Sequence, residues 1–212
     1  MLLITQLKKR LQKSLPGINA QLKMMNSVMK KRDPGAYFNA PENAKKACVM
    51  VLLFKKKSKW YTLLMQRPES PYPHSRQISL PGGKLEAIDA SLEAGALRET
   101  EEEFGIPAND IETIGRLSKL YIPVSDFLVH PFVGFIEKVP KYIIDYKEVA
   151  EIIEVKLEDL INPSIRKETN IKTYGGYTLK NTPYFDINGK VVWGATAMIL
   201  SEFVDILRSL DF

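Results

Sequence analysis

The stretch from Leu80 to Ile106 constrains this chain more than any other part of its sequence. It reads LPGGKLEAIDASLEAGALRETEEEFGI, a sharp turn followed by a helical pattern. Apolar and small residues recur at i+4 and predict the buried face of the helix: Leu92, Ala96, Thr100 and Phe104. Asp89 or Ser91 can cap the start of this helix near residue 91, and Gly105 ends it.

The helix ends in a run of carboxylates that opposes two local rules. Glu99, Glu102 and Glu103 fall on one arc beside the buried face, whereas Glu101 points elsewhere. Glu99 and Glu103 repel as like charges at i,i+4, and the helix dipole disfavours anions near its C-terminus. A solvated acidic helix end is the simpler interpretation. The Gly-Gly turn and the spacing of the glutamates favour the alternative, a divalent cation held by oxygen ligands.

The same residues resemble the Nudix box, Gly-x5-Glu-x7-Arg-Glu-U-x-Glu-Glu-x-Gly-U, where U is a bulky apolar residue. The matching positions are Gly83, Arg98, Glu99, Glu102, Glu103, Gly105 and Ile106. Asp89 fills the first acidic position, and the gap that follows it is one residue longer than in the general pattern. That longer loop resembles the branch of the family that hydrolyses coenzyme A.

The resemblance implies a set of roles for these residues. Glu99, Glu102 and Glu103 would hold one or more Mg²⁺ or Mn²⁺ ions, with a backbone carbonyl of Gly82 or Gly83 as a further ligand. Arg98 would orient the glutamates and can pair with Glu102 at i+4. One glutamate would act as general base, and which one stays open. The catalytic set is therefore Arg98 and the three glutamates, and Gly83 joins the glutamates in the metal set.

The proline-rich segment before the turn, residues 67–80, is expected to border the site. Its polar residues that could bind substrate are Arg67, His74, Arg76 and Gln77. Arg67 and Gln77, with Gly82 and Gly83, are the favoured substrate contacts, because arginine binds phosphate through two parallel hydrogen bonds. This segment also resembles the coenzyme A signature L-L-T-x-R-[SA]-x3-R-x3-G-x3-F-P-G-G. The chain keeps Leu63, Leu64, Arg67, Pro81, Gly82 and Gly83, and differs at Met65, Pro68, Tyr72, Arg76 and Leu80.

Strand patterns lie on both sides of the helix. The continuous apolar run 47–54 predicts a buried central strand, and 60–66 predicts the strand that returns from it as a hairpin. Further strands are expected over 111–120, 129–136, 172–179, 181–187 and 191–193, with the pair 172–179 and 181–187 forming a hairpin. Residues 146–160 predict a strand followed by a short helix, and 194–210 predict a closing helix. A mixed sheet between helices follows, in agreement with the α/β/α sandwich that the Nudix resemblance implies.

Three residues outside the box have two interpretations each. His130 lies between apolar residues and is interpreted as a structural histidine rather than a ligand. Glu148 and Glu151 are interpreted as surface carboxylates, with projection toward the metal site as the alternative.

The single cysteine, Cys48, lies in an apolar run and is interpreted as part of the core. One cysteine excludes an intrachain disulfide framework and fits a reducing compartment, so we expect a cytoplasmic protein.

The first 32 residues contain no acidic residue and carry a leucine stripe at i+4. We predict an amphipathic helix that packs on the domain with a solvated basic face. A mitochondrial presequence and a polyanion-binding or membrane-binding segment are the alternatives. Residues 33–42 read as a linker. The expected division is an N-terminal arm over 1–44 and a Nudix hydrolase domain over 45–212.

The function that the resemblance implies is hydrolysis of a nucleoside diphosphate linked to another group. The preferred substrate is coenzyme A or an acyl derivative, which would give 4′-phosphopantetheine and adenosine 3′,5′-bisphosphate. ADP-ribose or NADH is the second choice, and a noncatalytic nucleotide-binding or RNA-binding module is the third. We expect a small-molecule partner, no nucleic acid and no transmembrane segment, and leave a homodimer open. The net charge of +5 suits an anionic substrate, though it does not identify one.

Overall fold

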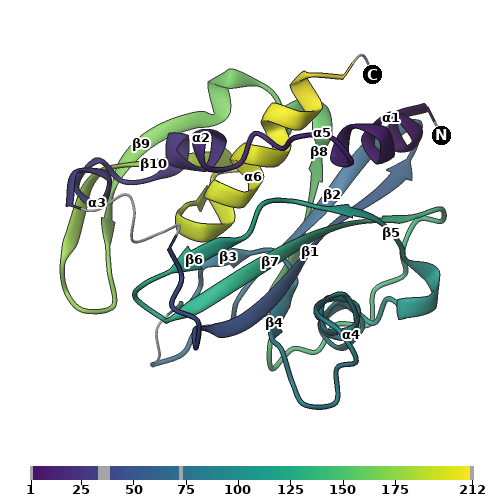
Figure 1. Cartoon of the computed structure of the whole chain (residues 1–212), viewed down its shortest axis with the longest axis horizontal. Helices are drawn as coiled ribbons and strands as arrows, with labels where there is room; N and C mark the ends of the chain where they lie inside the picture. The colour runs from purple at the N-terminus through teal and green to yellow at the C-terminus, as the bar shows by residue number, and fades with distance from the viewer. Residues whose placement is uncertain (1, 33–38, 72–73, 211–212) are drawn as a thin grey trace.

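A computed structural model describes residues 2–32, 39–71 and 74–210, which form two β-sheets with helices on both faces of the larger one (Figure 1). Within these residues the larger sheet has eight strands. They are β1 (Lys45–Lys56), β2 (Lys59–Gln66), β3 (Ile78–Ser79), β4 (Gly82–Lys84), β5 (Glu112–Arg116), β6 (Leu120–Ile122), β7 (Phe127–Ile136) and β8 (Glu151–Lys156).

Strand β1 is the centre of this sheet. It runs parallel to β7 from Lys45 opposite Phe127 to Phe54 opposite Ile136. On its other edge it pairs with β2 toward its end and with β4 toward its start, both antiparallel. Its side chains enter two apolar clusters, one on each face of the sheet, because helices cover both faces. This explains the unbroken apolar run and confirms the predicted central strand, the 47–66 hairpin and the core position of Cys48.

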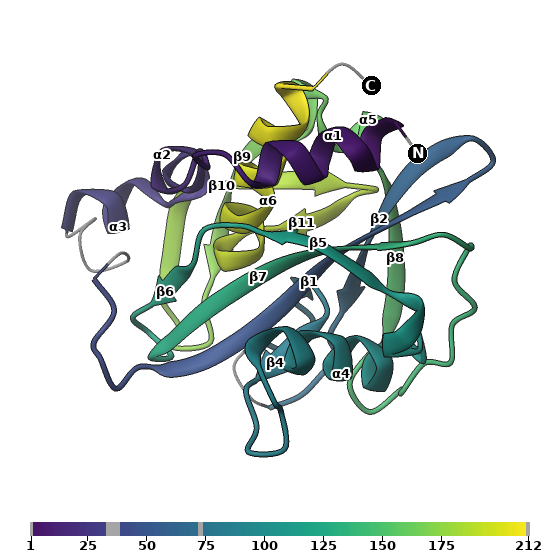
Figure 2. The same cartoon turned by 45° about the vertical axis from the view of Figure 1, so that its right-hand side comes forward.

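Helix α4 (Leu92–Phe104) covers one face, and α1 (Leu2–Leu11) and α6 (Gly194–Arg208) lie on the other (Figures 1 and 2). Ser91 caps α4, because its hydroxyl accepts a hydrogen bond from the Ala94 amide at 3.1 Å. Gly105 ends the helix in the left-handed conformation, with φ of 67°. The mixed sheet between helices is the α/β/α architecture predicted from the sequence.

Other predicted elements hold with changed boundaries. The strand over 129–136 is β7, and the strand and short helix over 146–160 are β8 and α5 (Leu157–Leu160). The strand expected over 111–120 is shorter, because β5 ends at Arg116 and β6 begins only at Leu120. A short 3-10 turn, η3 (Ala108–Asp110), joins α4 to β5.

The smaller sheet corrects one prediction. It consists of β9 (Arg166–Lys172), β10 (Thr178–Ile187) and β11 (Lys190–Val192). The hairpin expected between 172–179 and 181–187 is wrong, because Leu179 and the whole of 181–187 belong to the single strand β10, which pairs with β9 instead. The turn lies at Thr173–Tyr177, and the polar residues near 180 form an irregularity in the pairing between Leu179 and Thr182 rather than a turn. Another short turn, η4 (Pro163–Ile165), precedes β9.

The N-terminal arm packs on the sheet and α6. Leu3, Leu7 and Leu11 of α1 are buried in the same apolar cluster as α6, which confirms the packed amphipathic helix. After α1 come three short helices, α2 (Ile18–Gln21), η1 (Leu22–Met24) and α3 (Ser27–Arg32). Most of the predicted linker, residues 33–38, falls outside the described residues, and the division at 44/45 stays a prediction.

Two buried polar residues join the arm to the domain. Glu202 of α6 is fully buried, and its carboxylate accepts hydrogen bonds from the amides of Gly17 and Ser118 and from the Gln21 side chain. Asn26 donates to the Thr182 hydroxyl at 2.8 Å and to the Lys180 carbonyl at 3.0 Å. Among the described residues, no helix is long and apolar enough to cross a membrane.

Candidate active site

The carboxylates of the helix meet a carboxylate from a distant loop. Oxygen atoms of Glu99, Glu103 and Glu148 lie within 4.8 Å of one another. Glu99 and Glu103 are one turn apart on α4, so both face the same direction. Glu148 comes from the turn before β8. In this turn the backbone carbonyl of Asp145 accepts hydrogen bonds from the amides of Glu148 and Val149. Three segments of the fold therefore converge, since the Gly-Gly turn of β4 lies against the same glutamates.

The Gly-Gly turn fits because neither glycine has a side chain. Gly82 has φ of 140°, and a Cβ there would lie 2.2 Å from the Cys48 carbonyl oxygen. Its amide donates to Glu103 at 2.9 Å. A Cβ on Gly83 would lie 2.5 Å from the Glu99 carboxylate. The turn thus presses its backbone directly onto two of the three converging carboxylates.

Arg98 links the Glu99 carboxylate to two further carboxylates. Its guanidinium donates to Asp89 at 2.8 and 3.1 Å, to Glu99 at 3.0 Å and to Glu102 at 2.7 Å. The predicted i+4 pair of Arg98 with Glu102 is confirmed. Asp89, at the first acidic position of the box, anchors this arginine, and the hydrogen bond from Arg98 lowers the pKa of Asp89.

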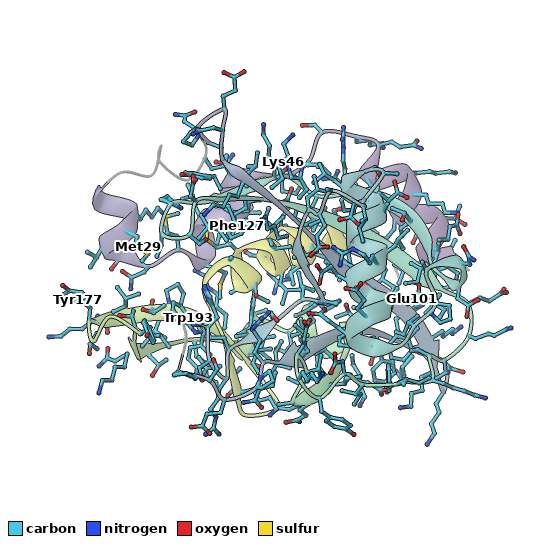
Figure 3. The ribbon with its side chains drawn as sticks, turned by 90° about the horizontal axis from the view of Figure 1, so that it is seen from below. Met29, Lys46, Glu101, Phe127, Tyr177 and Trp193 are labelled. Atoms are coloured by element: carbon cyan, nitrogen blue, oxygen red, sulfur yellow. The ribbon has the colours of Figure 1, made fainter. Side chains whose placement is uncertain are left out.

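Glu102 lies apart from the other two helix glutamates. Its side chain is 54% exposed. With Arg98 and Glu101 it lines a hollow of about 450 Å³ on the outer side of α4. Glu101, labelled on α4 in Figure 3, is exposed, and its carboxylate accepts a hydrogen bond from the Ala108 amide. This agrees with the prediction that Glu101 points away from the other glutamates. The structure therefore brings Glu148 to the cluster in place of Glu102, whose predicted role as a ligand remains a proposal.

The predicted substrate contacts lie at the end of β2. Arg67 is close enough for its positive charge to lower the pKa of Glu103, and its amide donates to the Gln77 carbonyl. The Gln77 side chain is held by His74, with its Oε1 2.9 Å from Nδ1. Arg76 is exposed and lies 3.7 Å from Glu69. Tyr72 falls outside the described residues.

Burial shapes the electrostatics of the cluster. Glu103 is buried, and this burial raises its pKa to about 8, with the negative charges of Glu99 and Glu148 acting in the same direction. The hydrogen bond from Gly82 and the charge of Arg67 oppose that rise. Burial also raises the pKa of Glu99, although Arg98 opposes it. Crowded and partly desolvated carboxylates of this kind suit a hard divalent cation, which would relieve their repulsion.

Reasoning from the sequence underrated Glu148. Its position beside the site depends on the pairing of β8 with β2 and on the Ala150 amide, which donates to the Gln66 carbonyl next to Arg67. No motif marks these contacts, so only the acidic character of the residue was visible. Glu151, the other candidate, pairs with Lys190 at 2.7 Å instead.

Comparison with known proteins assigns the family. A NUDIX domain model matches residues 44–173 of the chain. The chain belongs to the Nudix family. It is 32% identical over 160 residues to the uncharacterized Nudix hydrolase NudL of Citrobacter koseri, covering 76% of this chain and 81% of that protein. The NudL protein of Enterobacter sp. is 33% identical over 164 residues, with the same coverage of both chains.

Solved structures agree with the fold. A Nudix hydrolase from M. smegmatis, RenU, superposes with a TM-score of 0.51 at 12% identity, covering 79% of this chain and 88% of RenU. The MutT protein of Methanosarcina mazei gives a TM-score of 0.50 at 19% identity, covering 78% and 96%. These likenesses show the mixed α/β fold, and the family match with the NudL relatives makes the protein a Nudix hydrolase.

Proposed function

We propose that this Nudix hydrolase cleaves the phosphoanhydride bond of coenzyme A or an acyl-coenzyme A with the help of Mg²⁺ or Mn²⁺. The observation that carries the proposal is the convergence of Glu99, Glu103 and Glu148 within 4.8 Å beside the Gly-Gly turn. The products would be 4′-phosphopantetheine and adenosine 3′,5′-bisphosphate. The substrate choice is supported by the longer box loop and by the retained positions of the coenzyme A signature.

The residues of the site have three proposed roles: binding the cation, positioning a ligand and contacting the substrate phosphate. Glu99, Glu103 and Glu148 would hold the cation, with Glu102 and the Gly83 carbonyl as further proposed ligands. A bound divalent cation neutralises phosphate charge and makes water more acidic. Arg98 and Asp89 keep the Glu99 carboxylate in place, and Arg67 lies where it can contact a substrate phosphate.

Glu103 is the most buried of the proposed ligands. Its pKa is raised to about 8, and its carboxylate is oriented by the Gly82 amide. A carboxylate must be deprotonated to bind a cation, so Glu103 would lose its proton when the metal binds, and the general base stays open among the glutamates.

A panel of substrates tests the assignment. Purified protein is incubated with Mg²⁺ or Mn²⁺ and, separately, coenzyme A, acetyl-coenzyme A, ADP-ribose and NADH, and the products are identified by mass. Formation of 4′-phosphopantetheine at the highest kcat/KM supports the proposal. Preferred cleavage of ADP-ribose or NADH would replace coenzyme A with the second candidate. Salt-dependent RNA binding without turnover of any compound would favour the noncatalytic module.

A further inference from the structure

A group of positive side chains surrounds His130 on the α4 side of the sheet, and the reaction proposed above does not use it. We call this group the His130 cluster: Lys46, Arg116, Lys119 and His130. Its members come from β1, β5, β7 and the loop before β6, which are distant in sequence. The fold therefore brings together charged side chains that the sequence keeps apart.

Strand register places these side chains on one face. His130 lies beside Cys48 in the parallel β1–β7 pair, and Lys46 lies beside Leu128, two residues earlier. Because side chains two residues apart share a face, Lys46 and His130 lie on the side of the sheet that holds Cys48 and Phe132. Arg116 pairs with Phe132 across β5 and β7, so it belongs to that same face.

Lys119 completes the group. It precedes Leu120, which pairs with Val129 on the opposite face, and the alternation of side chains turns Lys119 toward His130. Neighbouring strands are about 4.8 Å apart, so the long side chains of Lys46, Arg116 and Lys119 can reach over the histidine ring.

The charges of the His130 cluster are uncompensated. Among the described residues, no ion pair or side-chain hydrogen bond involves Lys46, Arg116 or Lys119, and all three cations are exposed. His130 is half-buried, and its Nε2 is enclosed without a hydrogen-bond partner. Burial and the charges of Lys119, Lys46 and Arg116 together lower the pKa of His130. No carboxylate is among the charges that act on this ring.

We propose that the His130 cluster binds a phosphate group, either as free phosphate or as a phosphate monoester on a small molecule. Three unpaired cations suit a dianion better than a monoanion such as chloride or a carboxylate. The site is separate from the glutamates, because Gly83, which contacts Glu99, lies on the opposite edge of β1 from His130.

The sequence makes this proposal easy to follow by NMR. The chain has only two histidines, His74 and His130, so the ring resonances of His130 can be assigned with one variant. The metal-free protein, in EDTA, is titrated with inorganic phosphate and separately with adenosine monophosphate, at constant ionic strength set with chloride. We expect a saturable shift of the His130 ring signal and a rise in its pKa.

Matched variants separate a site from general attraction to a basic protein. The double variant K46Q/K119Q removes two charges of the cluster and should weaken phosphate binding about tenfold or more. The control K172Q/K180Q removes two exposed lysines from the smaller sheet and should bind as the parent does. Equal affinity of the parent and K46Q/K119Q, or a His130 shift that never saturates, would overturn the proposal.

The two titrants distinguish the sources of the phosphate. Tighter binding of adenosine monophosphate than of inorganic phosphate assigns the site to a nucleotide monoester. Equal or weaker binding assigns it to free phosphate. The experiment contains no divalent cation, so its result is independent of the proposed hydrolysis.

Discussion

At the scale of single residues, the glutamates of the cluster lower the stability of the fold when they ionise, and we attribute their presence to function. A carboxyl group that is buried beside two others costs free energy when it ionises, and nothing among its described neighbours fully offsets that cost. Glu103 shows this most clearly, because its burial raises the pKa from an ordinary value of 4.5 to about 8. Such a residue is expected where function requires it rather than where folding favours it.

The pH dependence of the free energy of unfolding tests whether the pKa of Glu103 is raised in the folded protein. Between about pH 4.5 and pH 8 the folded chain keeps a proton on Glu103 that the unfolded chain releases. The free energy of unfolding of the metal-free protein should therefore fall as the pH rises through that window, and the loss is complete above it. Glu103→Gln removes this effect and should be more stable than the parent at pH 9 by a few kcal/mol, with a smaller gap at pH 5. Urea unfolding in EDTA measures both values, and a gap that does not grow with pH would contradict the assignment.

Gly83 leaves room for the Glu99 carboxylate. Gly83→Ala would place a methyl group 2.5 Å from the Glu99 carboxylate, which must then move. We expect the affinity for Mn²⁺ to fall about tenfold or more, while the fold is kept. Isothermal titration calorimetry measures the affinity. Gly175→Ala is the matched control, since a Cβ there makes only ordinary contacts, 3.4 Å and more from Tyr177; a loss in both variants alike would point to general destabilisation.

At the scale of elements, one buried carboxylate joins the arm to the domain. Glu202 of α6 accepts hydrogen bonds from Gly17 and Gln21 of the arm and from Ser118 in the loop between β5 and β6. All of its hydrogen-bond partners are N–H donors. A glutamine at position 202 would therefore direct its own side-chain N–H groups toward one of these donors.

Glu202→Gln should therefore lower the free energy of unfolding by about 2–4 kcal/mol. Glu168→Gln, on the exposed strand β9, is the control and should change it by less than about 0.5 kcal/mol. Chemical denaturation followed by tryptophan fluorescence measures both. Equal stability of the two variants would mean that the arm is held by its apolar contacts alone.

The same scale shows what a sequence can predict. Strong periodic signals survive into the structure: the apolar run of β1, the capped helix α4 and the leucine stripe of α1. The hairpin near residue 180 failed because Asn181 and its polar neighbours resemble a turn, yet the backbone absorbs them as an irregularity inside β10. Local residue preferences favour a turn there, whereas pairing with β9 decides the outcome.

At the scale of the whole molecule, the site is assembled by topology. The Nudix box supplied Gly83, Arg98, Glu99 and Glu103 from one continuous stretch, so they were accessible to sequence reasoning. Glu148 was not, because the antiparallel pairing of β8 with β2 brings its loop back to the glutamates. The His130 cluster depends in the same way on the order of strands β1, β7 and β5.

The affinity for Mn²⁺ tests the central claim most directly. Calorimetric titration compares the parent with Glu99→Gln, Glu103→Gln and Glu148→Gln, and with Glu101→Gln as a control from the outer side of α4. Three carboxylates that share one cation predict that each of the first three variants binds Mn²⁺ about tenfold more weakly or worse, with the fold unchanged by circular dichroism and the control equal to the parent. Parent-like affinity in Glu103→Gln and Glu148→Gln would contradict the account.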